Sequence, residues 1–204
     1  HRWREWRVAP RTLALGVYGL FGFHFLLFVA LRTAPPLEAN LVNYLWPLLM
    51  VVLAPAFLSG VRLRPVHVGA ALAGFAGATL AIVGGQRVAG ELSWGYLAAA
   101  GSAFVWASYS LLTRRVAHFP TAAIGLFGLV SGLLALACHA LLEAPAALSA
   151  REWLLIFVVG LGPLGAAFFF WDAALKRSDP RRIGILSYLT PLASTLLLAA
   201  TTGR

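Results

Sequence analysis

The sequence predicts an all-α polytopic membrane protein with seven transmembrane helices. Of its 204 residues, 60% are hydrophobic and only 11% are charged, whereas soluble domains carry about 25% charged residues. Runs of about 20 apolar residues can cross a bilayer, and they should be helices because a helix satisfies its own backbone hydrogen bonds in lipid. Seven such runs are present, at residues 13–31, 37–59, 66–85, 94–112, 121–142, 153–175 and 183–200.

A phrase in the second run returns in the last run. Residues 44–48 (YLWPL) recur as residues 188–192 (YLTPL), 144 positions later, and the gapless alignment extends back to Gly16 and Gly160. The loop before the second copy is basic, whereas the loop before the first carries one Arg and one Glu. Because basic loops stay in the cytoplasm, the two copies should point in opposite directions. Such an inverted repeat is typical of secondary transporters with a site near the membrane midplane.

Basic residues predict the orientation of the chain in the membrane. If the chain starts in the cytoplasm, twelve of the 16 Lys and Arg residues fall in inner segments, as the positive-inside rule requires. We therefore expect a multi-pass protein of a bacterial inner (plasma) membrane with a cytoplasmic start. The net charge of +9 then reflects topology, and no nucleic-acid partner is expected. The inner residues are Arg2, Arg4, Arg7, Arg11, Arg62, Arg64, Arg114, Arg115, Lys176, Arg177, Arg181 and Arg182, and the outer ones are Arg32, Arg87, Arg151 and Arg204.

The repeat does not close within these residues. Spans 1 and 2 match spans 6 and 7, so the partners of spans 4 and 5 are expected upstream and the partner of span 3 downstream. Two further helices before and one after would give ten, arranged as two inverted repeats of five. The sequence therefore predicts a fragment of a ten-helix carrier.

Three phrases resemble those of EamA-type carriers in the drug/metabolite transporter superfamily. They are residues 38–47 (EANLVNYLWP), 104–109 (FVWASY) and 184–191 (GILSYLTP). The NYLWP phrase at residues 43–47 is similar to that of the YddG-type aromatic amino acid exporters. The resemblance implies two inverted five-helix repeats around a substrate cavity that opens alternately. It assigns residues 1–85 to the last three helices of the first EamA repeat and residues 94–204 to the first four helices of the second.

Aromatic and polar side chains lie beside three mid-span prolines. Proline removes a backbone donor and opens the helix, which lipid tolerates only where protein or a cavity satisfies the freed groups. We therefore expect hinges at Pro47, Pro163 and Pro191, with packing kinks as the alternative. An aromatic-walled cavity suits an amphipathic zwitterion with an apolar side chain, although each aromatic could instead pack between helices. The predicted substrate-binding residues are Asn43, Tyr44, Trp46, Trp106, Tyr109, Trp171, Ser187 and Tyr188.

Two ionisable residues are candidates for coupling or gating. His24 lies mid-span, where an ionisable group suggests function and could carry a coupling proton; a neutral His that bonds a neighbouring helix is the alternative. Glu38 opens the second span, where a carboxylate complements the helix N-terminus. Its expected role is capping, with gating or contact to a substrate amine as the second choice.

Two further patterns predict structure rather than chemistry. Asp172 stands four residues before Lys176, a spacing that predicts a surface ion pair. Small residues recur every four positions in the third span, which predicts close helix packing. This stripe consists of Gly69, Ala73, Gly77, Ala81 and Gly85.

The sequence predicts a secondary transporter and not an enzyme. It contains none of the common catalytic motifs, its single Cys138 has no partner for a disulfide or metal cluster, and no cofactor is expected. We expect export of small amphipathic metabolites by alternating access, with aromatic or other apolar amino acids as first candidates. The alternatives are a broad drug/metabolite exporter and a non-transporting membrane scaffold subunit. The expected partners are a small-molecule substrate and the lipid bilayer, with the chain as a monomer or homodimer.

Overall fold

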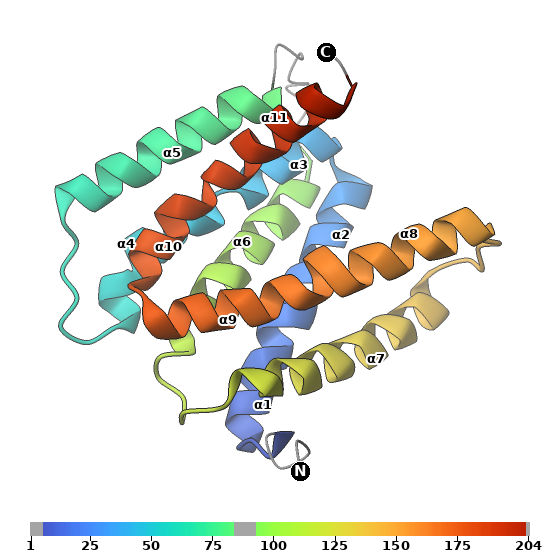
Figure 1. Cartoon of the computed structure of the whole chain (residues 1–204), viewed down its shortest axis with the longest axis horizontal. Helices are drawn as coiled ribbons and strands as arrows, with labels where there is room; N and C mark the ends of the chain where they lie inside the picture. The colour runs from blue at the N-terminus through green and yellow to red at the C-terminus, as the bar shows by residue number, and fades with distance from the viewer. Residues whose placement is uncertain (1–5, 84–92, 203–204) are drawn as a thin grey trace.

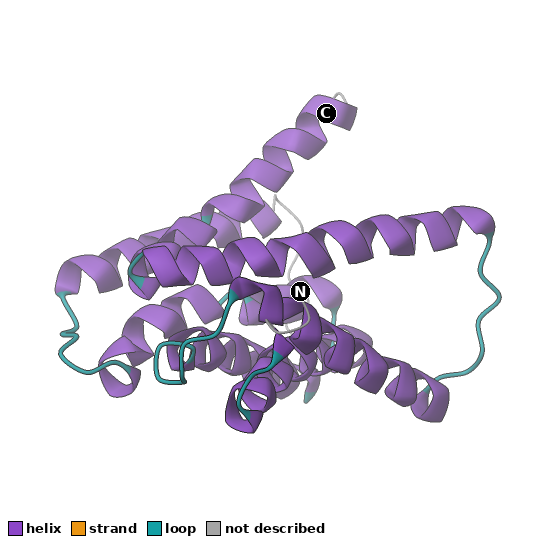
Figure 2. Cartoon of the chain, turned by 60° about the horizontal axis from the view of Figure 1, so that its bottom comes forward, coloured by secondary structure: helices purple, strands orange, loops and turns teal. Residues whose placement is uncertain are grey.

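Seven helical rods, broken at defined positions, form the described part of the chain (Figure 1). The computed structural model describes residues 6–83 and 93–202, and every regular element within these ranges is helical (Figure 2). This confirms the prediction of an all-helical fold. Six rods are long and apolar enough to cross a membrane, namely Pro10–Thr33, Pro36–Phe57, Pro65–Val83, Thr121–Leu142, Ala150–Arg177 and Pro180–Thr201.

The remaining rod, α6 (Gly95–Leu112), lies at the centre of the bundle. It packs against α2 (Phe23–Thr33), α3 (Pro36–Asn43) and α4 (Trp46–Phe57). Its serines and aromatics make it less apolar than the other rods, yet most of its side chains are buried by protein. A helix enclosed by other helices does not need a lipophilic surface. The fourth predicted span, residues 94–112, is therefore a helix, but most of its surroundings are protein side chains.

The two copies of the repeat break their first rod at matching positions. In each copy a π turn interrupts the helix, and the two π turns, η2 (Tyr18–Gly22) and η4 (Gly162–Ala166), lie 144 residues apart. In the second copy the turn brings the Gly160 carbonyl so close that a Cβ at Gly165 would lie 2.3 Å from its oxygen. A glycine is required at this bulge. The flanking helices are α1 (Pro10–Val17) with α2, and α8 (Ala150–Leu161) with α9 (Ala167–Arg177).

The second rod of each copy also breaks at equivalent residues. α3 ends at Asn43 and α10 (Pro180–Ser187) ends at Ser187, again 144 residues apart. Both helices begin with a proline, which suits the first helical position. The Asp179 side chain caps α10 by accepting a hydrogen bond from the Arg181 backbone N–H at 2.9 Å. The Arg181 guanidinium also bonds this carboxylate, which lowers the pKa of Asp179.

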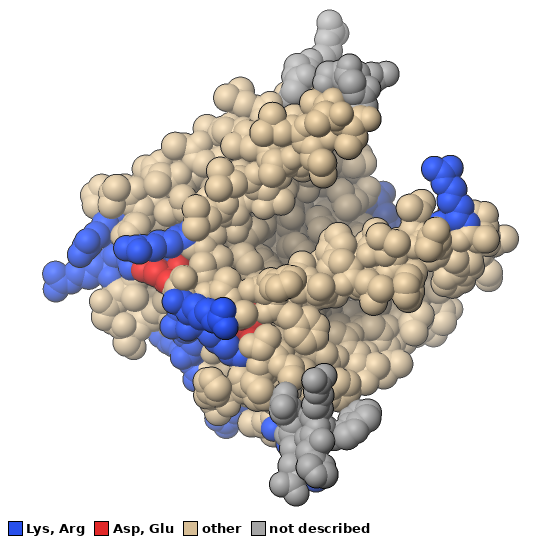
Figure 3. Space-filling model, viewed as in Figure 1, with Lys and Arg blue, Asp and Glu red and all other residues tan. Residues whose placement is uncertain are grey.

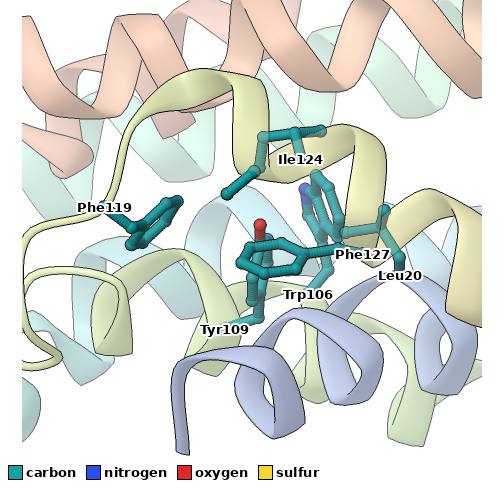
Figure 4. Packing of buried hydrophobic residues seen from close by; sticks show 7 residues of the cluster. Leu20, Trp106, Tyr109, Phe119, Ile124 and Phe127 are labelled. Carbon is teal, nitrogen blue, oxygen red and sulfur yellow. The ribbon is translucent and has the colours of Figure 1, made fainter. Parts of the chain in front are cut away.

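The main hydrophobic core lies where α6 meets the first rod and α7 (Ile124–Leu142), which follows the short turn η3 (Thr121–Ala123) (Figure 4). Two glycines let aromatic rings approach the first rod. A Cβ at Gly16 would lie 2.3 Å from the Phe127 ring, and a Cβ at Gly19 would lie 2.3 Å from the Tyr109 ring. The core therefore depends on bare backbone at these two positions. Its labelled members are Leu20, Trp106, Tyr109, Phe119, Ile124 and Phe127.

The small-residue stripe of the third span is not the packing face, so that prediction is wrong. A Cβ at Gly69 or Gly77 would meet nothing within 4 Å. The helix α5 (Pro65–Val83) instead buries Ala71 and Ala78 and contacts α11 (Leu189–Thr202). Small residues are frequent all around α5, so their spacing did not identify the buried face. Gly85 lies outside the described residues.

Basic side chains gather at the end of the molecule where α9 meets α10 (Figure 3). Several of them join helices there. Arg114 donates to the Leu175 and Ser178 carbonyls at the end of α9, and Arg115 donates to the Ala56 carbonyl of α4. Cations complement the carbonyl ends of helices. Among the residues that predict orientation, Arg2, Arg4, Arg87 and Arg204 lie outside the described residues.

The predicted ion pair of Asp172 and Lys176 is formed, but its carboxylate is buried and only Lys176 is partly exposed. The Asp172 side chain is 2% exposed, and Lys176 Nζ lies 2.6 Å from its carboxylate. Lys176 also donates to the Phe119 carbonyl at 2.8 Å and lies 4.1 Å from the centroid of the Phe119 ring. The surface prediction is wrong for Asp172 because the fold of the chain around this turn of α9 buries it. The pair therefore joins two parts of the chain at the basic end.

Candidate substrate-binding site

An aromatic cluster from both copies of the repeat surrounds Trp106 on α6. The rings of Trp106 and Trp171 lie 5.6 Å apart between centroids, and Trp46 lies 5.3 Å from Trp171 and 6.5 Å from Trp106. These separations are typical of interacting aromatic pairs. The rings of Tyr109 and Phe168 also lie close to Trp106, with centroids 5.3 and 5.6 Å from its own. We call these five residues, together with Phe23 at 5.1 Å from Trp106, the aromatic cluster.

The structure thus brings together four of the predicted site residues, Trp46, Trp106, Tyr109 and Trp171. Trp106 and Tyr109 are 6% and 2% exposed, whereas Trp46 and Trp171 are only half-buried. The indole N–H of Trp171 donates to the Ser110 hydroxyl at 3.1 Å. The cluster therefore has a sealed side on α6 and a partly open side on α4 and α9.

Asn43 lies one turn before Trp46, and its side chain contacts α6, the helix that carries Trp106. Its Oδ1 accepts a hydrogen bond from the Ser102 hydroxyl at 2.7 Å, and both side chains are buried. Ser102 stands one turn before Trp106 on α6. The amide is thus placed beside the aromatic cluster and already satisfied in part by protein, which fixes its orientation.

The two tyrosines of the repeated phrase differ in their surroundings. Tyr188 is 3% exposed, and its hydroxyl accepts from the Leu48 N–H and donates to the Tyr44 carbonyl, each at 3.1 Å. Tyr44 is half-buried at the break between α3 and α4. The Ser187 hydroxyl donates to the Ile183 carbonyl of its own helix at 2.8 Å. The structure therefore places Tyr188 and Ser187 in helix contacts and not in the aromatic cluster.

The three predicted hinge prolines all lie at helix irregularities. Pro47 follows the break at Tyr44 and Leu45, Pro163 lies in the π turn η4, and Pro191 lies near the start of α11. Proline has no backbone N–H to donate, so a helix hydrogen bond is lost at each of these positions.

A cavity of about 460 Å³ adjoins the aromatic cluster between α2, α7 and the π turn η4. His24 and Phe168 line it, and the two rings meet edge-on at 5.6 Å. His24 Nδ1 lies 2.6 Å from the Leu20 carbonyl, so this nitrogen carries a hydrogen and donates it to the carbonyl oxygen. The Ser131 hydroxyl is buried in the cavity wall without a hydrogen-bond partner in the described structure. The cavity is apolar with a few polar groups, as small-molecule sites are.

Charged side chains stand at the rim of this cavity. Arg32 at the end of α2 and His139 on α7 both lie 2.5 Å from the carboxylate of Glu143. The hydrogen bond from His139 and the charge of Arg32 lower the pKa of Glu143. Glu38, the other predicted gating residue, is buried in the first turn of α3 and does not line this cavity.

Sequence reasoning missed two members of the aromatic cluster, Phe23 and Phe168. The chain contains 13 Phe residues, so a Phe within a span stands out little. A usable signal was present, because Phe168 lies three residues before Trp171 and so shares its helix face. For Phe23 the signal was its position next to His24, a predicted functional residue; the two ring centroids lie 4.9 Å apart.

Comparison with known proteins identifies the family. The model of the EamA-like transporter family matches residues 2–83 and again residues 93–203. The aromatic amino acid exporter YddG of Ancylobacter novellus is 49% identical over 186 residues, or 90% of this chain and 64% of that protein. YddG of Escherichia coli is 27% identical over 172 residues, or 80% of this chain and 58% of that protein.

A solved crystal structure shares the fold, with a TM-score of 0.89 and 44% identity over 98% of this chain and 70% of the other. The chain spans less than two thirds of the length of the curated relatives it matches. The resemblance seen in the three sequence phrases is confirmed. This multi-pass membrane protein belongs to the EamA-like transporter family.

Proposed function

We propose that this chain is part of a ten-helix carrier that exports aromatic or other apolar amino acids across a bacterial inner membrane by alternating access. Residues 1–85 would form the last three helices of the first inverted repeat and residues 94–204 the first four of the second. The separate family matches to residues 2–83 and 93–203 support this division. The relatives named as aromatic amino acid exporters support the substrate class.

The observation that carries the proposal is the aromatic cluster itself. Trp46 lies in the proposed first five-helix repeat, whereas Trp106 and Trp171 lie in the proposed second, and their rings meet. A side chain with an aromatic ring can stack among them, because ring pairs at these distances attract one another beyond simple burial. A site built from both copies also changes shape when the copies move relative to one another, as alternating access requires.

The described state supports access from the end that carries Arg32. The cavity beside the aromatic cluster has its charged rim at Arg32 and Glu143. The opposite, basic end is joined by the hydrogen bonds of Arg114, Arg115 and Lys176. The basic end also has a hollow of about 640 Å³ beside Arg114, Arg115 and Lys176, but no residue of the aromatic cluster lines it. Only the cavity on the Arg32 side reaches the cluster, through Phe168. With the basic end cytoplasmic, we therefore propose that this state is outward-facing. Export would require these inner contacts to release.

Transport by the full-length protein in proteoliposomes tests the proposal. We expect counterflow of radiolabelled phenylalanine that unlabelled tryptophan and tyrosine inhibit and glycine does not. Equal inhibition by unrelated organic cations would instead indicate a broad drug/metabolite exporter. Absence of counterflow for every amino acid, in vesicles where the protein is folded, would contradict the proposed function.

Labelling of single cysteines tests the orientation. Cysteines placed at Ser59, between Phe57 and Arg62, and at Ser178, before Arg181, should react only with reagent on the cytoplasmic side. A cysteine at Ala146, between α7 and α8, should react from outside, because the basic segments stay in the cytoplasm. Labelling of Ala146 and Ser178 from the same side would contradict the proposed topology.

A further inference from the structure

The hydroxyl of Tyr188 occupies a gap in the helix of the other copy. In a continuous α-helix the N–H of Leu48 would bond the carbonyl of Tyr44, four residues earlier. Here the Tyr188 hydroxyl lies between these groups, 3.1 Å from each. It accepts from the one and donates to the other, so a single side chain replaces the missing backbone bond. Two polar backbone groups are thereby satisfied where lipid or an apolar core would penalise them.

The neighbouring residues explain why the gap exists and why Tyr188 reaches it. Pro47 has no N–H, so the helix cannot bond the Asn43 carbonyl, and the ladder opens at this turn. α10 crosses close to the opening, since a Cβ at Gly184 would lie 3.1 Å from the Pro47 carbonyl oxygen. The ring of Tyr188 lies against Gly74 of α5, where an added Cβ would be 2.5 Å from the ring. One side of the ring therefore packs directly against the backbone of Gly74.

The corresponding bridge in the other direction is not formed. Tyr44 is the repeat partner of Tyr188, and the groups equivalent to those bridged by Tyr188 are the carbonyl of Tyr188 and the N–H of Leu192. Within the described structure the Tyr44 hydroxyl makes no hydrogen bond. The helix breaks differ in the same way as the hydrogen bonds. Two residues, Tyr44 and Leu45, separate α3 from α4, where the Tyr188 hydroxyl is inserted, but only Tyr188 separates α10 from α11. The two copies are thus related in sequence, but their helix breaks have different conformations.

We propose that Tyr188 and Tyr44 form a reciprocal hydrogen-bond switch. In the present state Tyr188 holds the break in the first copy open. In the opposite state, Tyr44 inserts between the Tyr188 carbonyl and the Leu192 N–H, and the break in the first copy closes. This inference rests on the proposed alternating access, in which inverted repeats exchange their conformations. The break that Tyr188 holds open precedes Trp46, so the switch also positions one wall of the aromatic cluster.

Two single substitutions test the switch by their opposite effects. Tyr188→Phe removes the hydroxyl that favours the present state, and Tyr44→Phe removes the hydroxyl that favours the other. Cys138 lines the cavity beside the aromatic cluster, so in a full-length protein with Cys138 as its only cysteine, its labelling rate by an external maleimide reports the outward-facing fraction. We expect Tyr188→Phe to lower and Tyr44→Phe to raise the equilibrium constant for that state, each by about fivefold, the effect of one net hydrogen bond.

The control is Thr195→Val, because the Thr195 hydroxyl donates to the Pro191 carbonyl of its own helix at 2.8 Å. It should leave the labelling rate unchanged, and the double tyrosine variant should return near the wild-type rate. Shifts of both single variants in the same direction, or no shift in either, would overturn the switch. If Tyr188→Phe does not fold, Tyr44→Phe alone still decides, since it must increase labelling. Labelling needs no substrate, so failed amino acid counterflow with the expected opposite shifts would refute the proposed substrates and leave the switch standing.

Discussion

Replacing Trp106 with leucine is expected to lower the transport of aromatic amino acids about tenfold, the effect of roughly 1.4 kcal/mol. Trp106 contacts five other rings, and each aromatic pair contributes about 0.5 to 1.5 kcal/mol beyond burial. Leucine keeps apolar bulk but cannot stack on a substrate ring. Counterflow per folded molecule, with membrane abundance measured in parallel, checks the result. Transport of aliphatic amino acids should fall less, because they do not stack.

Phe127→Leu is the matched control for Trp106→Leu. Phe127 is 1% exposed and belongs to the same hydrophobic core (Figure 4). Its ring pairs with Phe119 at 5.4 Å and is not one of the five rings that pair with Trp106. Both variants should lose stability to a similar degree, as truncated core aromatics do. If Phe127→Leu reduces transport per folded molecule as much as Trp106→Leu does, the aromatic cluster is packing and not a binding wall.

Gly19→Ala is expected to destabilise the protein by about 1 to 3 kcal/mol, the usual cost of overpacking. The new Cβ would lie 2.3 Å from the ring of Tyr109. Tyr109 is nearly fully buried and its ring lies 5.3 Å from Trp106, so the displacement reaches the aromatic cluster. A lower midpoint of thermal unfolding in detergent, together with weaker binding of tryptophan, would show both effects.

Gly22 provides the control in the same π turn. A Cβ there would meet only Val105, at an ordinary 3.6 Å. Gly22→Ala should therefore leave the unfolding midpoint close to wild type. Equal destabilisation by Gly19→Ala and Gly22→Ala would mean that the π turn itself, rather than the Tyr109 contact, requires glycine.

Much of the fold followed from composition and apolar run length, because lipid permits few alternatives to helices. The matched breaks at Tyr44 and Tyr188 followed from the repeated phrase. The gathering of Trp46, Trp106 and Trp171 was also predicted, from aromatic residues placed deep within their spans. These predictions depend on local patterns that the sequence displays directly.

Other features depend on which helix face meets which neighbour, and the sequence alone could not show them. In α5 small residues occur on every face, so the stripe through Gly69 was chosen although Gly74 lies against Tyr188. Asp172 and Lys176 have the spacing of a surface pair, and only the fold of the chain around them buries Asp172 and brings Lys176 to the α6–α7 connection. The hydroxyl of Tyr188 acts on a backbone gap 144 residues away, a contact that no local pattern encodes.

The position of a bound aromatic amino acid tests the central claim most directly. A structure of the full-length protein determined with tryptophan should show the ligand ring among Trp46, Trp106 and Trp171, with its charged groups toward the cavity that His24 lines. The three indoles should separate to admit it. A ligand bound elsewhere, with the aromatic cluster packed as it is here, would contradict the account.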